Sequence, residues 1–535
     1  MGGQGCPNAS TQTLVPKESE KAHVTSVEED GNLSGLQCAF LLITLTSASF
    51  LVLIDASILA PAIPPITSQF HSLSDVAWYG SAYQLSSSSL QPLTGRIYTH
   101  FSLKWTYIMF LVIFELGSLI CAIASSSKML IIARAIAGIG AAGIQNGSLT
   151  IIARSLSMKR QAATLGAVMA ISQLGLVLGP LIGGALTDFV SWRWCFWINL
   201  PIGGIINIAM FFVNIPDPKT PDDDLSALQI IRQKLDLIGF LILAPALIQL
   251  LLALNYGGSQ YAWSSPPVIG LFGGSASMFI MFIAWEYRTG AKAMFPLHII
   301  CQRIVACSCL FLFFLGGMTA CASYYLPLYF QVVKDASPMM SGVYILPSVI
   351  SQLLLVISIG PLVGRVGYYL PFSIATGAVS SIGNGLTSLL SPSTSPGTWI
   401  GYQMIIGIGR GIGMQSPLIA VQSTVPVGQI SIAVSMLSFS QSLGQALFLT
   451  LAQAIFLNSL KSALSAYAPS EDPRAVIAAG AGAIRTAVSK DKLPGVLVAY
   501  SQGIDHVFYL ATGIAICCFC VAWGMGWKTI RKRQV

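Results

Sequence analysis

Charge is scarce in this 535-residue chain, because Asp, Glu, Lys and Arg together make up 9% of its residues. Soluble proteins carry about 25% charged residues, so a water-facing surface of ordinary size cannot be built from this sequence. Hydrophobic residues instead make up 54%, and the mean hydropathy is +0.72. Most of the chain must therefore face a lipid bilayer or other apolar helices.

Histidine is also rare, with five residues, and no His pairs with any of the 11 Cys at metal-ligand spacing. No cluster of His, Cys or carboxylates has catalytic spacing, which makes a membrane enzyme the least favoured class. The phosphate-binding pattern Gly-x-x-x-x-Gly-Lys-Ser/Thr is absent, so ATP is not the direct energy source. We expect no enzymatic activity, no metal and no cofactor.

The net charge of +8 could indicate a nucleic-acid partner, but the placement of the basic residues argues against one. Lys and Arg lie in short gaps between apolar runs, mostly in alternate gaps, which is a pattern of membrane topology. With the N-terminus in the cytoplasm, the short outer loops hold Lys128, Arg193 and Lys334. We therefore expect a multi-pass membrane protein with both termini in the cytoplasm and no nucleic-acid partner.

The apolar residues form fourteen runs of about 20 residues, the length at which a helix crosses a bilayer. Three short matches at one fixed offset indicate a duplicated six-helix unit: Pro92–Ile97 with Pro361–Val366, Gly138–Gly140 with Gly407–Gly409, and Leu174–Gly175 with Leu443–Gly444. We predict an all-α polytopic membrane protein with 14 transmembrane helices, arranged as two six-helix bundles plus an inserted helix pair.

The predicted organisation has five parts. Residues 1–36 form a disordered cytoplasmic tail, and residues 37–214 form the N-terminal six-helix bundle. Residues 215–290 hold a cytoplasmic linker and the inserted spans 7 and 8. Residues 291–526 form the C-terminal six-helix bundle with an outer loop at 458–505, and residues 527–535 form a basic cytoplasmic tail.

Three motifs resemble those of the 14-span drug:proton antiporters in the major facilitator superfamily. Leu130–Ala142, with Arg134, Gly138 and Gly140, is similar to the facilitator motif of span 4. Gly175–Gly184 is similar to the antiporter motif of span 5, and Trp192–Gly203 to the signature that opens span 6. The resemblance covers about residues 37 to 526 and implies the major facilitator fold. Fungal toxin and multidrug efflux pumps are the most similar members.

The loop between spans 2 and 3 departs from the family pattern. It keeps Gly95, Arg96 and Lys104, but Thr99 stands where the family has an acid and Ser102 stands where it has a second glycine. The charge latch attributed to this loop is therefore weakened, which puts the usual gating account in doubt but not the fold.

Charges inside a membrane cost a few kcal/mol, so each one is a functional candidate. Asp55 lies six residues before Pro61 on span 1, and Arg134 lies six residues after Lys128 on span 4. Both are therefore about 9 Å from the outer helix ends. Equal depth and opposite sign predict that they interact, with Asp55 as a proton carrier. The alternative is a permanent ion pair that holds two helices together.

Two further charges have open roles. Glu115 is either a proton relay or a protonated acid that is hydrogen-bonded inside the bundle. Arg410, on span 12, either lines the substrate cavity or stabilises helix ends. In the repeat, the three charges of the first half correspond to neutral polar residues of the second half: Asp55 to Tyr324, Glu115 to Asn384, and Arg134 to Gln403. We therefore place proton coupling in the N-terminal half and more of the substrate binding in the C-terminal half.

A glycine face on span 5 is the candidate gating element. Gly175, Gly179 and Gly183 recur every four residues and share one helix face. Such a face allows a second helix to approach closely, and Pro180 permits a bend. The interpretation is a sliding hinge that also includes Gly184, and the alternative is close packing alone.

Neutral amides and aromatic rings suit an uncharged, ring-bearing small molecule. The candidate cavity residues are Gln145, Asn146, Tyr324, Tyr325, Gln403, Arg410 and Gln415. Taken singly, each polar side chain could equally form a hydrogen bond between helices.

The resemblance implies a secondary transporter that exports hydrophobic or amphipathic compounds by alternating access, driven by protons moving inward. An uptake symporter, for instance for an iron chelate, and a receptor that has lost transport remain open as alternatives. The plasma membrane is the expected location, with the vacuolar membrane as the alternative. We expect a monomer.

Overall fold

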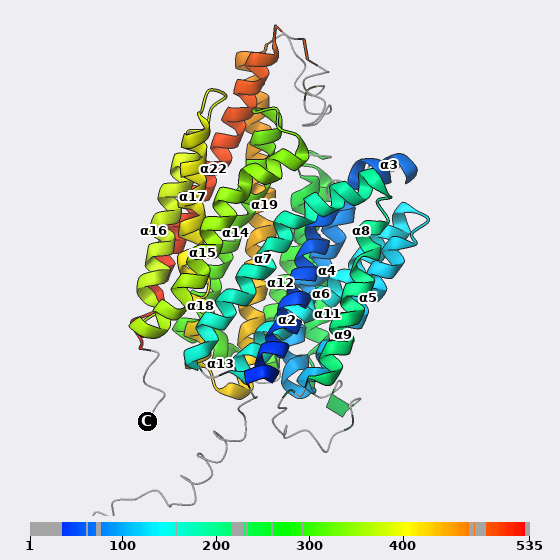
Figure 1. The fold of residues 1–535 in the computed structure, drawn as a ribbon, viewed down its shortest axis with the longest axis vertical. Coiled ribbons are helices and arrows are strands. Elements are labelled where there is room, and N and C mark those ends of the chain that lie inside the picture. Colours follow the sequence, from blue (N-terminus) through cyan, green and yellow to red (C-terminus); the bar gives the residue numbers. More distant parts are fainter. Residues whose placement is uncertain are drawn as a thin grey trace, which may run out of the picture.

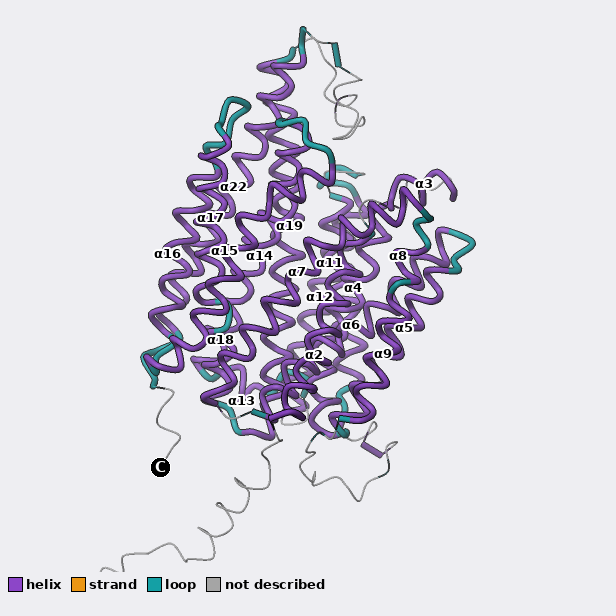
Figure 2. Tube along the Cα trace, in the orientation of Figure 1, coloured by secondary structure: helices purple, strands orange, loops and turns teal. Residues whose placement is uncertain are grey.

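The computed structural model describes residues 35–59, 62–70, 76–156, 158–213, 215, 226, 229–230, 234–257, 261–290, 293–469, 476, 488–489 and 491–529. This part of the chain is a bundle of long α-helices (Figures 1 and 2). Its β-structure consists of two isolated bridges, Gly257 with Tyr261 and Tyr368 with Thr529. The all-helical prediction is confirmed.

The helices fall into three groups along the sequence. The first holds α2 (Gly35–Ile58), α3 (Ile63–Phe70), α4 (Val76–His100), α5 (Leu103–Ala122), α6 (Ser127–Ser155), α7 (Met158–Phe189), α8 (Trp194–Trp197) and α9 (Asn199–Phe212). The second holds α11 (Leu237–Tyr256), α12 (Pro266–Thr289) and the short α13 (Leu297–Ile300). The third holds α14 (Arg303–Val332), α15 (Pro338–Val366), α16 (Leu370–Thr387), α17 (Pro396–Gly413), α18 (Ser416–Thr424), α19 (Ile430–Tyr467) and α22 (Leu493–Gly524).

Twelve helical segments of the described chain are long and apolar enough to cross a membrane, with α8–α9 and α17–α18 each counted as one. The long helices α4 and α16 are not among them. Both are rich in polar side chains: α4 contains the run Ser86–Ser89, and α16 contains Ser380, Ser381 and Asn384. The count of fourteen spans therefore stays a prediction.

Packing in the two large groups follows one pattern. In the first group α2 packs against α7, while α4 and α5 pack against α6; in the third, α14 packs against α19, while α15 and α16 pack against α17. The two halves meet where α4 packs on α19 and where α7 packs on α15. These correspondences agree with the repeat in the sequence. The inserted pair α11–α12 lies beside one of these seams, because α11 contacts both α4 and α19.

Close helix contacts depend on glycine. On α6, a Cβ at Gly138 would collide with Tyr83 and Ser86 of α4, and a Cβ at Gly140 would collide with Phe114 of α5. Small residues give helices in a membrane the close approach that replaces a hydrophobic driving force. The glycines of the span-4 motif therefore let α4 and α5 pack on the two sides of α6.

The helix α2 begins, and the helix α22 ends, at the same end of the molecule, which we call the termini end (Figure 1). At the opposite end, α19 continues to Tyr467 and α22 starts at Leu493. Residues 458–467 and 493–505 of the predicted outer loop are therefore helical. Residues 1–34 and 530–535 of the predicted tails, and 216–225 of the predicted linker, lie outside the described residues.

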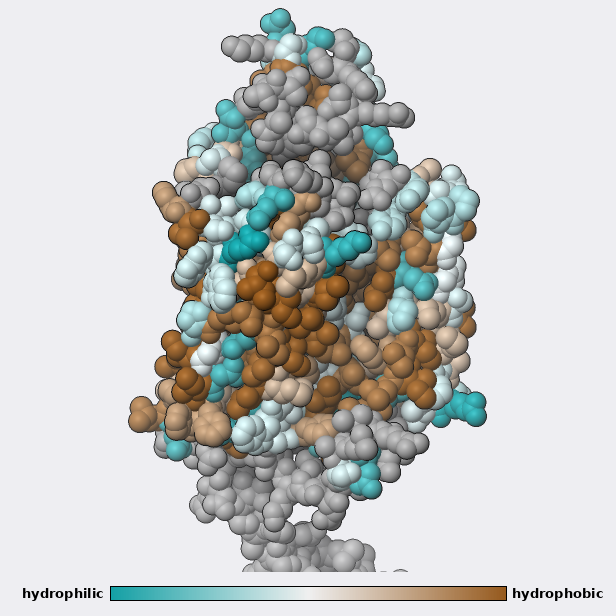
Figure 3. All heavy atoms as spheres, turned by 90° about the vertical axis from the view of Figure 1, so that its right-hand side faces the viewer, coloured by the Kyte–Doolittle hydropathy of each residue, from teal (hydrophilic) through white to brown (hydrophobic). Residues whose placement is uncertain are grey.

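The side of the molecule that faces right in Figure 1 carries an apolar belt between two more hydrophilic ends (Figure 3). The helices α5 and α9 lie on this side of the molecule (Figure 1). Their exposed apolar side chains include Met109, Leu116, Ile205 and Ile208. Apolar side chains exposed at this density suit a lipid environment rather than water.

Candidate functional site

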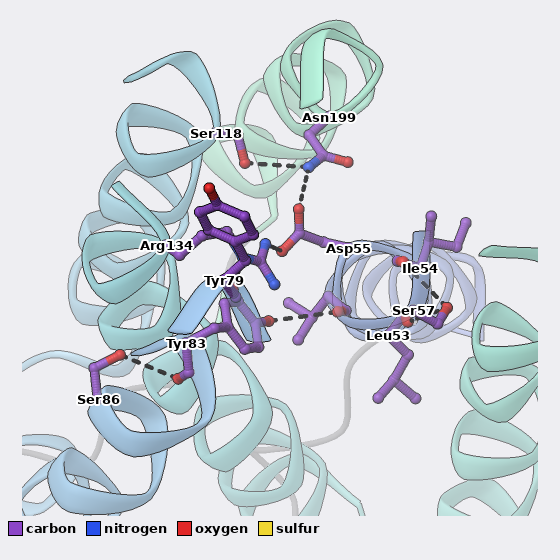
Figure 4. Close-up of polar contacts among 11 residues, drawn as sticks. Leu53, Ile54, Asp55, Ser57, Tyr79, Tyr83, Ser86, Ser118, Arg134 and Asn199 are labelled. Atoms are coloured by element: carbon purple, nitrogen blue, oxygen red, sulfur yellow. Dashed lines mark hydrogen bonds and ion pairs between the residues drawn. The ribbon is translucent and has the colours of Figure 1, made fainter. Parts of the chain in front are cut away.

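A buried ion pair joins α2 and α6 in the N-terminal half. Arg134 Nη1 lies 2.6 Å from Asp55 Oδ2, and the two side chains are only 1% and 0% exposed (Figure 4). The interaction predicted from their equal depth is confirmed. A buried pair of this kind contributes little net stability, but removing one partner leaves an uncompensated charge at a cost of about 3–5 kcal/mol.

A second donor completes the coordination of the Asp55 carboxylate. Asn199 Nδ2 donates to Asp55 Oδ1 at 2.8 Å and also to Ser118 Oγ at 3.1 Å (Figure 4). Asn199 is the first residue of α9, and it is fully buried. The sequence places Asn199 in the span-6 signature but gives it no role in the site. The one signal for it was a lone amide within an apolar, aromatic motif.

The helix α4 encloses the guanidinium of Arg134. Arg134 Nε donates to the carbonyl oxygen of Tyr79 at 3.2 Å. Arg134 Cζ lies 4.3 Å from the centre of the Tyr83 ring. The Tyr83 hydroxyl donates in turn to the carbonyl of Val52 on α2 at 3.4 Å. Helices α2, α4, α5, α6 and α9 thus converge on one buried acid and one buried base. Protonation of Asp55 would weaken its attraction to Arg134 and alter contacts on all of these helices.

The glycine face of α7 contacts the turn of α2 that carries Asp55. A Cβ at Gly175 would lie 2.7 Å from the Phe50 carbonyl oxygen, and a Cβ at Gly179 would collide with Ser57 Oγ. The hydroxyl of Ser57 also donates to the Gly175 carbonyl at 3.1 Å. The residues predicted for gating and the acid predicted for proton binding therefore meet at one helix contact.

The remaining residues of the predicted hinge have other surroundings. The carbonyl of Gly183 accepts a hydrogen bond from Cys195 Sγ at 3.8 Å, and a Cβ at Gly184 would have no neighbour within 4 Å. Pro180 lies inside α7 and lacks an N–H, so the helix loses one backbone hydrogen bond there. Gly184 therefore takes no part in the contact with α2.

Glu115 lies in a separate polar contact between α5 and α9. Its Oε1 accepts from Asn207 Nδ2 at 2.7 Å, and a Cβ at Gly203 would collide with the same carboxylate. Asn199, Gly203 and Asn207 are four residues apart and share one face of α9. This face touches Ser118 and Glu115 of α5, so a single row of α9 residues reaches both acids.

Three of the predicted cavity amides form hydrogen bonds between helices. Asn146 Nδ2 donates to Thr94 Oγ1 at 2.7 Å, Gln403 Nε2 to the Tyr344 carbonyl at 2.9 Å, and Gln415 Nε2 to the Val356 carbonyl at 3.1 Å. All three amide side chains are buried. The structure therefore gives them the helix-bridging role that was the alternative for each.

The other predicted cavity residues differ in exposure. Tyr324 on α14 is 63% exposed, whereas the neighbouring Tyr325 is 5% exposed and packs its ring against Phe456 at 5.4 Å. Arg410 is buried in α17 at 6% exposure, and Gln145 is half-buried. Tyr324 is thus the most accessible aromatic residue of the predicted set.

The motif predicted for a loop lies at the termini end, but its residues are helical: Gly95 and Arg96 belong to α4 and Lys104 to the first turn of α5. A Cβ at Gly95 would collide with Ser435 of α19, and Arg96 donates through Nη2 to the Ala293 carbonyl. Lys104 Nζ donates to the Phe211 carbonyl at 2.6 Å in the last turn of α9, where unpaired carbonyls favour a cation. Gly95 and Arg96 therefore touch other parts of the chain at a seam between the halves.

Among the described residues, no group of three or more His, Cys, Asp or Glu is placed to hold a metal ion. The ionisable groups of the site are instead single carboxylates with hydrogen-bonding or cationic partners. This arrangement can bind and release a proton, and it offers no cluster of ligands for a metal.

Comparisons with known proteins agree with this architecture. Residues 45–449 match the Major Facilitator Superfamily. The chain is 52% identical over 502 residues to the MFS-type transporter pigP of Monascus ruber, covering 94% of this chain and 88% of that protein. It is 45% identical over 534 residues to the efflux pump mlcE of Penicillium citrinum, covering 98% and 95%.

A solved structure with a similar fold is that of the human organic anion transporter MFSD10 (TETRAN). The TM-score is 0.57 at 13% sequence identity, with 89% of this chain and 99% of that chain covered. At this identity the likeness concerns the fold alone. The family match and the fungal relatives lead to one conclusion: the chain belongs to the Major Facilitator Superfamily and is a membrane transporter, not an enzyme.

Proposed function

We propose that this transporter exports small hydrophobic or amphipathic organic compounds, such as fungal secondary metabolites, in exchange for protons. The observation that carries the proposal is the buried Asp55–Arg134 pair seated against the glycine face of α7. Relatives that cover nearly the whole chain at 45% identity are named efflux pumps, which favours export over uptake.

Asp55 binds the proton and α7 responds to it. When the site is open to the outside, a proton neutralises Asp55 and weakens its attraction to Arg134. The turn of α2 that holds Ile54, Asp55 and Ser57 then shifts against Gly175 and Gly179, because glycine leaves no side chain to obstruct the movement. When the site opens to the inside, Asp55 releases the proton into the cytoplasm and pairs again with Arg134. The substrate moves outward during the same cycle.

The same proposal includes fourteen spans, with the termini end in the cytoplasm. In addition to the twelve apolar segments, α4 and α16 would cross as polar helices that other helices largely cover, since α4 packs on α6 and α19 and α16 packs on α17 and α22. Lipid-facing helices need apolar surfaces, but helices inside a bundle tolerate polar ones. Both halves lie in one chain, so a monomer is sufficient for transport. We place this monomer in the plasma membrane.

For the substrate we assign Tyr324, Gln145 and Arg410 to the cavity. Tyr324 offers an exposed ring on α14, and Arg410 offers a buried cation in the C-terminal half. An aromatic surface with few polar groups selects ring-bearing compounds, and a desolvated guanidinium favours those that carry a carbonyl or carboxylate oxygen.

The test is gradient-driven export from membrane vesicles. Vesicles that hold the wild type, Asp55→Asn or Glu115→Gln would be given a panel of aromatic metabolites and a pH gradient. We expect Asp55→Asn to abolish gradient-driven accumulation, because an amide cannot exchange the proton, and Glu115→Gln to retain most of it. Export that survives in Asp55→Asn and fails in Glu115→Gln would assign the proton to Glu115 and contradict the proposal.

A further inference from the structure

A short strap follows the inserted helix pair at the termini end. Ala293 and Met294 are fully buried and Phe295 is 9% exposed, although they belong to a connection between helices. Connections normally run over the surface, because buried backbone groups need hydrogen-bonding partners. The burial of this strap, residues 293–295, therefore requires a specific set of partners.

Two acids of the inserted pair hold the strap. Glu286 of α12 accepts from the backbone N–H of Met294 at 3.1 Å and from that of Phe295 at 2.8 Å. Asp236, the N-cap of α11, accepts from the same Met294 N–H at 3.2 Å. Asp236 is itself fixed by Gly239 N–H at 2.8 Å and by Trp285 Nε1 at 2.9 Å. Both carboxylates are buried.

The strap also contacts the seam between the halves. Arg96 of α4 donates to the Ala293 carbonyl, one residue before the Met294 N–H that both acids accept. The ring of Phe295 lies 5.3 Å from that of Phe439 on α19 and 6.0 Å from that of Phe282 on α12. One three-residue segment thus joins the inserted pair to a helix of each half.

The seam at this point is tightly closed. Gly95, the neighbour of Arg96, leaves no room for a Cβ beside Ser435, and Arg154 of α6 donates to Ser431 Oγ at 2.9 Å. Residues 430–437, the first two turns of α19, are all buried. Any state that opens at the termini end must separate these surfaces, and the strap lies across them.

We propose that the strap, with Asp236 and Glu286 as the acids opposite Arg96, is a lock that stabilises the state closed at the termini end. Thr99, three residues after Arg96 on α4, carries no charge, and the inserted pair supplies acids from elsewhere in the chain. The role of the inserted helices is therefore to set the balance between the two states of the cycle. This inference rests on the proposed alternating access.

The lock can be tested without transport, by measuring how quickly a cysteine in the seam is labelled. In a protein whose exposed Cys301, Cys517 and Cys520 are replaced by serine, Ser435→Cys would report opening to a polar maleimide in detergent. We expect Glu286→Gln and Arg96→Gln each to speed labelling by about tenfold or more, because a hydrogen bond to a charged group is worth at least that factor.

The matched control is Arg288→Gln, which removes an exposed charge two residues further along α12 and should leave the labelling rate unchanged. The double variant Arg96→Gln/Glu286→Gln should label no faster than the faster single variant, since both changes break one lock. Unchanged rates in both single variants, with unchanged melting temperatures, would overturn the inference. So would a double variant whose rate is the product of the two single effects. Labelling needs neither substrate nor gradient. The experiment can therefore contradict the lock while the export proposal stands, and the export test can fail while the lock stands.

Discussion

At the scale of single residues, the site consists of two acids with different partners. Asp55 has a cation and an amide, whereas Glu115 has one amide from the same face of α9. A proton on Asp55 would remove its charge attraction to Arg134, whereas a proton on Glu115 would alter only a hydrogen bond to a neutral amide. This difference is the physical reason to prefer Asp55 as the proton carrier.

The two asparagines of α9 offer a matched comparison. We expect Asn199→Leu to impair gradient-driven export strongly, since Asp55 Oδ1 and Ser118 Oγ both lose the hydrogen bond from Asn199. The substitution should also lower the stability by about 1–3 kcal/mol. Asn207→Leu removes a similar hydrogen bond from Glu115 and should leave most export intact. Initial export rates, compared at equal amounts of folded protein, decide the matter. The opposite order of effects would favour Glu115.

The sequence was sufficient for the contact between Asp55 and Arg134, because depth along a helix follows from residue counting. It was not sufficient for Asn199, nor for the hydrogen bonds of Asn146, Gln403 and Gln415. Those depend on how each helix is rotated about its axis, and the rotation is set by packing with neighbours that a single sequence does not specify. The sequence therefore identifies the polar residues of a span, but not the neighbouring helix toward which each side chain points.

At the scale of the helix, α7 and α2 form the contact on which the proposed movement depends. The face that meets α2 ends within the motif, since a Cβ at Gly179 would collide with Ser57 and a Cβ at Gly184 would meet nothing within 4 Å. The two glycines lie five residues apart in one helix. Comparing a substitution at each therefore distinguishes the close contact with α2 from the general effect of replacing a glycine in a helix.

We expect Gly179→Ala to cost about 1–3 kcal/mol by overpacking against Ser57 and to slow export. Gly184→Ala should be neutral or stabilising by up to about 1 kcal/mol, because alanine favours the helix. Thermal unfolding in detergent and export rates provide the measurements. Equal effects of the two substitutions would show that the close approach to α2 is not what the motif provides.

Hydropathy identified the segments that suit lipid, but it did not identify the ends of the helices. Residues 458–467 and 493–505 contain polar residues such as Lys461, Ser465 and Asp505, and their hydropathy predicts a loop where the structure has helix. Outside the apolar belt, a helix can carry such residues freely, because water solvates them. The hydropathy pattern therefore fixes where a helix meets lipid, and packing between α19 and α22 decides where it stops.

At the scale of the whole molecule, the contacts between the halves described above lie toward the termini end. They include Gly95 beside Ser435 and Arg154 with Ser431. A further contact is at Gly166 of α7, where a Cβ would lie 2.8 Å from the Val356 carbonyl of α15. With the termini end in the cytoplasm, as proposed, these contacts close the molecule on its cytoplasmic side.

Two adjacent tyrosines on α14 test that assignment. In the same cysteine-reduced protein, Tyr324→Cys should react with a membrane-impermeant thiol reagent added outside intact cells, because Tyr324 is 63% exposed toward the end away from the termini. Tyr325→Cys should not react, since that position is 5% exposed. A transported compound should protect the first position. Labelling of Tyr324→Cys from the cytoplasmic side alone would reverse the orientation.

The duplicated architecture was readable from three short matches, and the packing of the halves follows it. The position of the inserted pair was not readable, because nothing in the pattern of apolar residues says beside which seam a helix pair will lie. Its contacts with α4, α19 and Arg96 come from shape and charge in three dimensions.

The helix α19 runs without a break from the closed seam at Ile430 to Tyr467, about 57 Å at 1.5 Å per residue. A rod of that length extends well past the apolar core of a bilayer, which is about 30 Å thick. If α19 tilts about its buried first turns, residues 430–437, its other end near Tyr467 must move by a larger distance. A fluorescent or spin label near Tyr467 would act as a pointer, reporting on one side of the membrane how the gate on the other side moves.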